Sequence, residues 1–187
     1  MKLDDKELVA QTLKGREEAF EMIIKRYQTP IINFIGRMVG EYQQAVDLSQ
    51  EVFIKAYSSL SLFDPKYKFS NWLFKIASNL CIDFWRKKKI FTFSMDQSIS
   101  SENNLYPQIS DAKPSVIEQY EKKQLIQKLE KVIDKLPPSL RELFVLRHIN
   151  DLSYQEIAQI KEIPVGTVKN KVFRAKERIK FLLEEEK

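Results

Sequence analysis

Positively charged side chains gather near the end of the chain, in the stretch Ile163–Lys180, which reads IPVGTVKNKVFRAKERIK. This stretch carries six cations and one acid, Glu177, so its net charge equals the +5 of the whole chain. The cations are Lys169, Lys171, Arg174, Lys176, Arg178 and Lys180. A second basic run, Arg86–Lys89, lies far away in the sequence. Positive charge concentrated in this way is typical of a protein that binds a polyanion.

Side chains for nucleophilic or metal chemistry are scarce. Cys81 is the only cysteine and His148 the only histidine, and they lie in different segments within apolar helical patterns, which favours structural roles. A single cysteine excludes an internal disulfide and a multi-cysteine metal site. Lys14-Gly15-Arg16 lacks the flanking glycines of a phosphate-binding loop. We therefore expect no enzymatic activity, no catalytic residue, no metal and no cofactor.

The N-terminal residues 1–14 alternate charged side chains with isolated Leu and Val and contain no continuous apolar run. They are therefore unlike a signal peptide, whose central region is apolar. No stretch of the chain approaches the roughly 20 apolar residues that a membrane-spanning helix needs. We expect a cytoplasmic protein that is not itself embedded in a membrane.

Helices are the elements that must position the basic stretches. Apolar residues recur three and four residues apart, as on one face of a helix, in the segments 17–27, 45–60, 70–89 and 116–136. Residues 94–115 are instead rich in Ser, Asn, Asp and Pro without any period, which indicates a linker or long loop. The sequence predicts an all-α protein of two small helical domains, residues 1–93 and 116–187, joined by a flexible linker.

The second domain contains a predicted helix-turn-helix. Ser153 and Glu156 form the S-x-x-E capping box of a short helix, Lys161–Ile163 make a tight turn, and Pro164 begins the next helix. Five apolar side chains of this last helix share its inner face: Val168, Val172, Ala175, Ile179 and Leu182. Glu162 takes the turn position often held by Gly, where a left-handed backbone costs roughly 1 kcal/mol. The second helix of such a motif enters the DNA major groove, so the sequence predicts duplex binding.

Two helical segments of the first domain carry mixed faces. The core side of 70–89, a helix that we expect Ser70 to cap, holds Trp72, Leu73, Ile76, Ala77, Leu80 and Phe84, and the polar stripe opposite holds Asn71, Lys75, Ser78, Asn79 and Arg86. Phe74 and Trp85 lie beside this stripe and fit either the core or a basic surface on which unstacked bases stack. In 45–60 the residues expected inside are Leu48, Val52, Phe53 and Tyr57. The remaining outer face mixes polar groups with one Ile, which suits a protein partner.

The motifs of both domains resemble one protein family. The run LPPSLRELFVLRHINDLSYQEIAQIKEIPVGTVKNKVFRAKERI resembles the sigma-4 domain of bacterial extracytoplasmic-function (ECF) sigma factors of the sigma-70 superfamily. DLSQEVFIKAY, followed by KFSNWLFKIASNLCIDFWRKKK, resembles their sigma-2 domain. The resemblance implies a transcription initiation factor that binds core RNA polymerase, at the β′ clamp helices and the β flap, and promoter DNA. It also implies control by an anti-sigma factor, which in this family is often bound to the membrane.

The resemblance also implies a role for each surface. Contacts to the minus-35 duplex are expected from Pro164, Thr167, Lys169, Asn170, Lys171, Phe173, Arg174 and Arg178. Contacts to the melted minus-10 strand are expected from Lys66, Tyr67, Lys68, Phe69, Asn71, Trp72, Lys75, Asn79, Asp83, Arg86 and Lys87. Contacts to core polymerase are expected from Asp47, Gln50, Glu51, Ile54 and Lys55.

Two other functions fit part of the sequence. A stand-alone helix-turn-helix regulator that binds a duplex operator as a dimer explains the C-terminal motif equally well. It does not explain the aromatic and basic helix in 70–89. An RNA-binding helical module explains the basic runs but not the turn geometry. Dependence on RNA polymerase separates the sigma factor from both alternatives.

Overall fold

The computed structural model describes the backbone of residues 3–92 and 116–185 and the side chains of residues 3–88 and 124–185. This part of the chain is helical and contains no strand. Its elements are α1 (Asp5–Leu13), α2 (Glu17–Val39), α3 (Tyr42–Ser58), the 3-10 turn η1 (Leu60–Leu62), α4 (Phe69–Thr92), α5 (Val116–Asp134), α6 (Pro138–His148), α7 (Tyr154–Lys161) and α8 (Val165–Glu185). The predicted linker 94–115 lies outside the described residues. No helix in the described ranges has the length and apolar character to span a bilayer.

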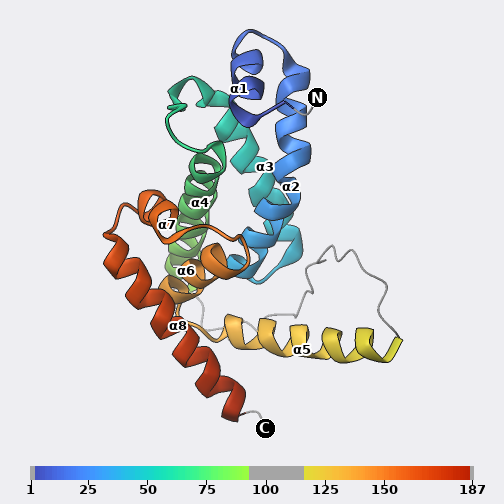
Figure 1. Cartoon of the computed structure of the whole chain (residues 1–187), viewed down its shortest axis with the longest axis vertical. Helices are drawn as coiled ribbons and strands as arrows, with labels where there is room; N and C mark the ends of the chain where they lie inside the picture. Colours follow the sequence, from blue (N-terminus) through green and yellow to red (C-terminus); the bar gives the residue numbers. More distant parts are fainter. Residues whose placement is uncertain (1–2, 93–115, 186–187) are drawn as a thin grey trace.

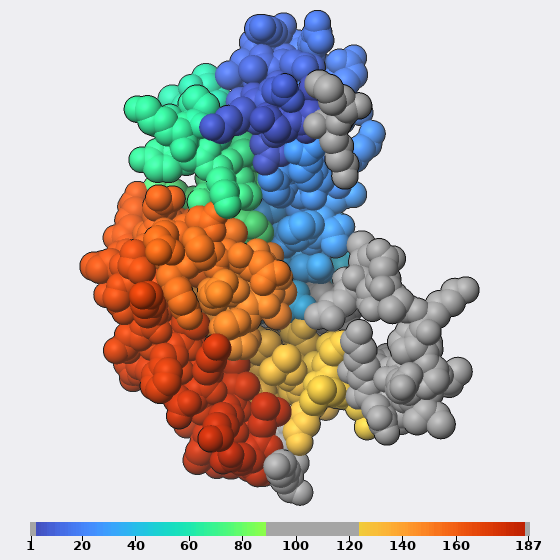
Figure 2. All heavy atoms as spheres, viewed as in Figure 1, coloured from blue at the N-terminus to red at the C-terminus, as the bar shows by residue number. Residues whose placement is uncertain are grey.

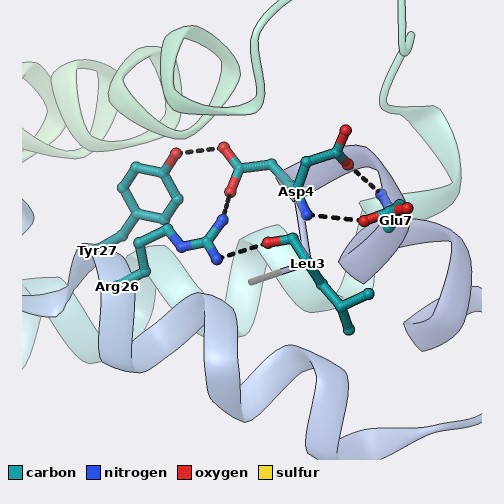
Figure 3. Close-up of polar contacts among 6 residues, drawn as sticks. Leu3, Asp4, Glu7, Arg26 and Tyr27 are labelled. Carbon is teal, nitrogen blue, oxygen red and sulfur yellow. Dashed lines mark hydrogen bonds and ion pairs between the residues drawn. The ribbon is translucent and has the colours of Figure 1, made fainter. Parts of the chain in front are cut away.

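The first four helices form a bundle in which α2, α3 and α4 pack side by side and α1 lies against the start of α2 (Figure 1). Phe34 of α2 and Phe74 of α4 are buried and meet edge to face, with ring centroids 5.5 Å apart. The hydroxyl of Tyr27 donates to Asp5 at 2.5 Å, and Arg26 pairs with the same carboxylate, which fastens α1 to α2 (Figure 3). These contacts make the first four helices one packed unit.

Helix α2 extends further than the 17–27 segment predicted from its apolar pattern. It passes through Pro30, which lacks an N–H to donate, and ends at Gly40. Neighbouring buried side chains, among them Ile31, Phe34 and Ile35, continue the apolar face beyond the proline. Packing therefore outweighs the helix-breaking tendency of Pro30.

Gly40→Ala is expected to lower the free energy of unfolding by about 1 kcal/mol. Gly40 caps α2 with a left-handed backbone, φ 82°, and donates its N–H to the Gly36 carbonyl at 2.8 Å. No atom lies within 4 Å of the position of an added Cβ, so the cost is backbone strain rather than a clash. Urea unfolding measures this loss of stability. Gly166→Ala is the control, because Gly166 lies inside α8 and also has no atom within 4 Å of an added Cβ. An equal loss in the control would contradict backbone strain at Gly40 as the cause.

The last four helices form a second unit, in which α6, α7 and α8 pack together and α5 contacts both α8 and α2. The two units lie directly against each other: α7 packs on α4, and α6 packs on α2. Figure 2 shows the orange side chains of the second unit directly against the green and blue side chains of the first. The arrangement therefore brings the predicted helix-turn-helix onto the helix that carries the polar stripe.

Candidate nucleic-acid interface

The helix-turn-helix is built as its sequence predicted. The N–H of Glu156 donates to the Ser153 hydroxyl at 3.2 Å, and the Ser153 N–H donates to the Glu156 carboxylate at 2.7 Å, which completes the capping box of α7. Glu162 ends α7 with the left-handed backbone expected of it, φ 54°. The Pro164 carbonyl accepts from the Thr167 N–H at 2.9 Å, and α8 begins at Val165, one residue later than predicted.

Helix α8 buries its apolar stripe and exposes its cations. All five predicted inner residues are buried: Val168, Val172, Ala175, Ile179 and Leu182. The predicted minus-35 residues Pro164, Thr167, Lys169, Asn170, Phe173, Arg174 and Arg178 are exposed. Lys171 is only half-buried and lines a groove toward the first unit, so it lies apart from that set. Within the described part of the chain, the α8 cations form no ion pair and remain available to an anion.

The loop before α4 presents cations and an aromatic ring. The Asp64 side chain accepts from the Lys66 N–H at 2.9 Å, and the Asp64 carbonyl accepts from the Tyr67 N–H at 3.1 Å, which fixes a tight turn. Lys66 and Lys68 are exposed, and Tyr67 is 52% exposed. The loop borders a pocket of ≈ 370 Å³ whose wall includes Tyr67, Trp72 and Lys75. Asn79, Arg86 and Lys87 are also exposed, and Asp83 forms an ion pair with Arg86 at 3.3 Å.

Phe69 is a correction to the expected minus-10 set. It is 1% exposed and packs against the rings of Tyr27, Phe63 and Trp72, with centroids 5.4–5.8 Å apart. Because α4 begins at Phe69, Ser70 lies inside the helix and does not cap it. The expectation of a capping Ser70 is therefore wrong, and Phe69, which was expected to contact the melted strand, is a core residue in this structure because aromatic packing draws the end of the loop inward.

The exposed polar stripe on α4 is a second correction. Asn71 and Ser78 are 6% and 1% exposed, although both were expected on the surface. The physical reason is the packing of α7 on this face of α4. Phe74 is buried and belongs to the core. The Trp85 indole N–H donates to the Met38 carbonyl at 2.9 Å, but this ring is half-buried and lines a groove, so it does not belong to the core.

Two cations of the predicted minus-10 surface pair with acids of the second unit. Lys68 lies 2.7 Å from Glu156, and Lys75 lies 2.5 Å from Glu162. Burial raises the pKa of Glu156, but hydrogen bonds from Lys68 and Ser153 outweigh it, and the pKa falls below its usual value. The hydrogen bond from Lys75 lowers the pKa of the exposed Glu162. Both acids are thereby held in their charged forms.

Sequence reasoning missed the polar contacts that join the two units. The Ser78 hydroxyl donates to Glu142 at 2.5 Å, and the Lys161 ammonium donates to Glu142 at 2.6 Å and to Ser78 at 2.8 Å. Arg37, which is 1% exposed, pairs with Glu130 at 2.6 Å. A buried charge is normally paired, so the burial of Arg37 implies an acidic partner. The sequence offered no other signal of this contact.

The outer face of α3 is exposed as predicted. Asp47, Gln50, Glu51, Ile54 and Lys55 all reach solvent, and Ile54 is 68% exposed. Glu51 and Lys55 form an ion pair at 3.3 Å along the helix. Tyr57 was expected inside but is 48% exposed, and its ring meets the buried ring of Phe20 edge to face. The face combines one large apolar side chain with charged groups.

Cys81 and His148 lie outside the sets of residues expected to contact DNA or polymerase. Cys81 is 1% exposed, and burial raises the pKa of its thiol to about 12, with the nearby Glu142 adding to the shift. Burial and the positive charges of Lys176 and Arg147 lower the pKa of His148. In the ranges whose side chains are placed, no three His, Cys, Asp or Glu residues lie together as a metal site.

Comparison with known proteins identifies the two units. The family pattern described as Sigma-70 region 2 matches residues 23–90, and the pattern described as Sigma-70, region 4 matches residues 126–179. The ECF RNA polymerase sigma factor SigW of Bacillus subtilis (strain 168) is 36% identical over an alignment of 189 residues, gaps included, that covers 96% of this chain and 97% of that protein. The chain belongs to the ECF sigma factors. The ECF RNA polymerase sigma-E factor of Escherichia coli (strain K12) is 34% identical over 182 residues, 95% of this chain and 93% of that protein.

Solved structures share the fold. RpoE of Bartonella quintana, in complex with the anti-sigma factor NepR, matches with a TM-score of 0.73 and 22% identity over 88% of this chain and 96% of that one. CnrH, in complex with the cytosolic domain of CnrY, matches with a TM-score of 0.71 and 22% identity over 98% of this chain and 99% of that one. The all-α fold of a sigma factor is therefore confirmed.

As an ECF sigma factor, the protein is a transcription initiation factor and not an enzyme. The stand-alone regulator is not favoured, because it leaves the region 2 match at residues 23–90 unexplained. The unit α1–α4 is called the sigma-2 domain from here on, and the unit α5–α8 the sigma-4 domain.

Proposed function

We propose that this sigma factor directs core RNA polymerase to promoters by reading DNA at two separate surfaces. The observation that carries the proposal is the separation of charge: α8 exposes cations that form no ion pair with the described residues, and a loop with Lys66 and Tyr67 exposes a second basic surface in the sigma-2 domain. The proposed domains are residues 1–93 and 116–187, joined by the linker 94–115. Bacterial RNA polymerase acts in the cytoplasm, which we propose as the location.

Helix α8 suits the major groove of the minus-35 duplex. Its buried stripe leaves the opposite half of the helix to the DNA, and Asn170 and Arg174 lie on that half. Asn can bond adenine with two hydrogen bonds and Arg can do the same with guanine, so these two residues are suited to base reading. Lys169 is exposed and lies about 100° around the helix from Asn170, at 100° per residue, so it flanks the base-reading residues. It is placed to contact a phosphate beside the groove, which would give affinity without sequence preference.

The α4 loop suits the melted minus-10 strand. The pocket of ≈ 370 Å³ beside Tyr67 and Trp72 joins aromatic surface to the positive charge of Lys75. Unstacked bases bind by stacking on aromatic rings while cations contact their phosphates. Lys66, Lys68, Arg86 and Lys87 would extend this contact along the strand. Phe69 is buried among aromatic rings, and we propose for it only the support of this surface, whereas Asn71 lines the pocket and is proposed to contact the strand.

Polymerase and anti-sigma contacts complete the proposal. The exposed face of α3, with Asp47, Glu51 and Ile54, is proposed to dock on the β′ clamp helices, and the sigma-4 domain on the β flap. An apolar groove of ≈ 690 Å³ runs between α4 and the sigma-4 domain, past Ile82, Trp85 and Leu143. A groove of this kind supports control by an anti-sigma factor, the class of partner found on the RpoE structure above.

Tyr67→Ala is expected to reduce open-complex formation roughly tenfold, because stacking of a base on an aromatic ring contributes about 1–3 kcal/mol. The measurement is the yield of transcripts from holoenzyme on promoters that mapping of RNA 5′ ends has located. Tyr67→Phe keeps the ring and should retain most of the activity. A template with an artificially melted minus-10 region should restore part of the lost yield. Full activity of Tyr67→Ala on intact duplex would show that the Tyr67 ring does not contact the melted strand.

A further inference from the structure

We propose that in the free protein the sigma-4 domain masks the strand-binding face of the sigma-2 domain, with Glu156 and Glu162 taking the place of DNA phosphates on Lys68 and Lys75. The proposal rests on the function proposed above, because that function gives the face a strand to bind. In this proposal the helix-turn-helix and the melted strand compete for the same side chains of the sigma-2 domain. The face is therefore available to DNA only after the two domains separate.

Two ion pairs place carboxylates of the sigma-4 domain on cations of the strand-binding face. Lys68 lies 2.7 Å from Glu156 of α7, and Lys75 lies 2.5 Å from Glu162 at the turn that follows. A carboxylate at this distance from an ammonium group occupies the position of a phosphate oxygen. Both acids belong to the helix-turn-helix that carries α8. The motif proposed to bind the minus-35 duplex thus covers the minus-10 surface with its other side.

The pocket beside the loop is lined by residues of both domains. Its wall combines Tyr67 and Trp72 of the sigma-2 domain with Gln159, Ile160 and Glu162 of the sigma-4 domain. Asn71, at the base of this pocket, is 6% exposed although it lies on the polar side of α4. An incoming base would meet side chains of α7 where the open face of α4 should be. The base and α7 therefore compete for one space as well as for two charges.

A buried polar contact holds the middle of the interface. Glu142 of α6 is 7% exposed and accepts from both Ser78 of α4 and Lys161 of α7, at 2.5 and 2.6 Å. Removal of one member of such a buried network leaves a charge without its partner and is strongly destabilising, so it orients the two domains. The outer pairs are weaker, because Lys68 and Glu162 are 73% and 72% exposed and salt screens them. Exposed pairs at the rim make the contact reversible.

Cys81 reports on this contact. It is the only cysteine of the chain, is 1% exposed, and lines the groove between the domains together with Glu142 and Lys161. Separation of the domains removes the sigma-4 side of this groove and brings the thiol toward solvent. The rate at which a thiol reagent modifies Cys81 therefore measures how often the domains part.

The test compares the full chain with the double variant Glu156→Gln, Glu162→Gln. Gln at position 156 keeps an acceptor for the Ser153 N–H, so the capping box survives while the charge is lost. The control is Glu184→Gln with Glu185→Gln, which removes the same charge from exposed acids at the end of α8. Two quantities are measured in each protein: the rate of Cys81 modification, and the affinity for a short single-stranded DNA of mixed sequence.

The proposal predicts that Cys81 reacts several-fold faster in the Glu156, Glu162 variant than in the wild type or the control, with cooperative unfolding retained. It also predicts that this variant binds the single strand several-fold more tightly than the control of equal charge. Coupling of wild type with a zero-length carbodiimide should join Lys75 to Glu162. Equal rates and equal affinities in variant and control, without that cross-link, would overturn the masking contact. Faster Cys81 modification without tighter strand binding would instead show that the domains part but that the face binds no strand, which is failure of the proposed function.

Discussion

Arg174→Ala lowers the affinity of the holoenzyme for the minus-35 duplex by roughly 1–3 kcal/mol, the expected loss for an Arg that reads a base. Arg174 is exposed on α8, one helical turn beyond Asn170, and makes no ion pair within the described residues. Its planar fork can donate two parallel hydrogen bonds to guanine, which Ala cannot replace. Competition between promoter duplexes with intact and altered minus-35 elements measures the loss.

Two matched variants separate base reading from charge. Arg174→Lys keeps the positive charge but not the fork, so it should still lose most of the preference for the intact element. Lys180→Ala removes one cation from the same helix about 9 Å further along its axis and should weaken all duplexes equally and slightly. Affinity for core polymerase should be unchanged in all three. If Arg174→Ala weakened intact and altered elements alike, Arg174 would be a phosphate contact and not a base reader.

Asp47→Arg combined with Glu51→Arg is expected to reduce affinity for core polymerase by about 3 kcal/mol, more than a hundredfold, because reversed charges at an interface cost several kcal/mol. Both acids lie on the exposed face of α3 beside Ile54, which is 68% exposed. They do not contribute to the buried core, so the fold should survive. Titration of labelled core polymerase with each variant measures the loss.

The control for this variant is Glu17→Arg with Glu21→Arg on α2. It makes the same change of charge on exposed acids of the same domain, and Glu21 pairs with Lys25 as Glu51 pairs with Lys55. We expect near wild-type affinity for polymerase from the control. Equal losses in the two variants would point to net charge or misfolding, and would leave α3 without a role in docking.

Features set by neighbouring residues in the sequence were predictable. The capping box at Ser153, the left-handed Glu162 and the inner stripe of α8 each depend on residues within one or two helical turns. The exposed face of α3 followed from the same helical spacing. Predictions of this kind succeed because local propensity and packing agree in these segments.

Features set by contacts between the domains were not predictable. Asn71 and Ser78 were expected on the surface because helical spacing places them opposite the apolar side chains of α4, yet α7 covers that side. Lys75 meets Glu162 across 87 residues of chain, and Ser78 meets Glu142 across 64. Amino-acid periodicity carries no information on which polar face receives another domain. The same limit hid the Arg37–Glu130 pair.

Transcription in vitro shows whether this protein directs core RNA polymerase to promoters. Core RNA polymerase is supplied with fragmented genomic DNA from the source organism, with and without this protein, and the RNA 5′ ends are mapped. We expect new start sites that appear only with the protein and share two upstream sequence elements at a fixed spacing. Absence of new starts, together with salt-sensitive binding of the protein alone to duplex DNA, would contradict this expectation and favour a stand-alone helix-turn-helix regulator.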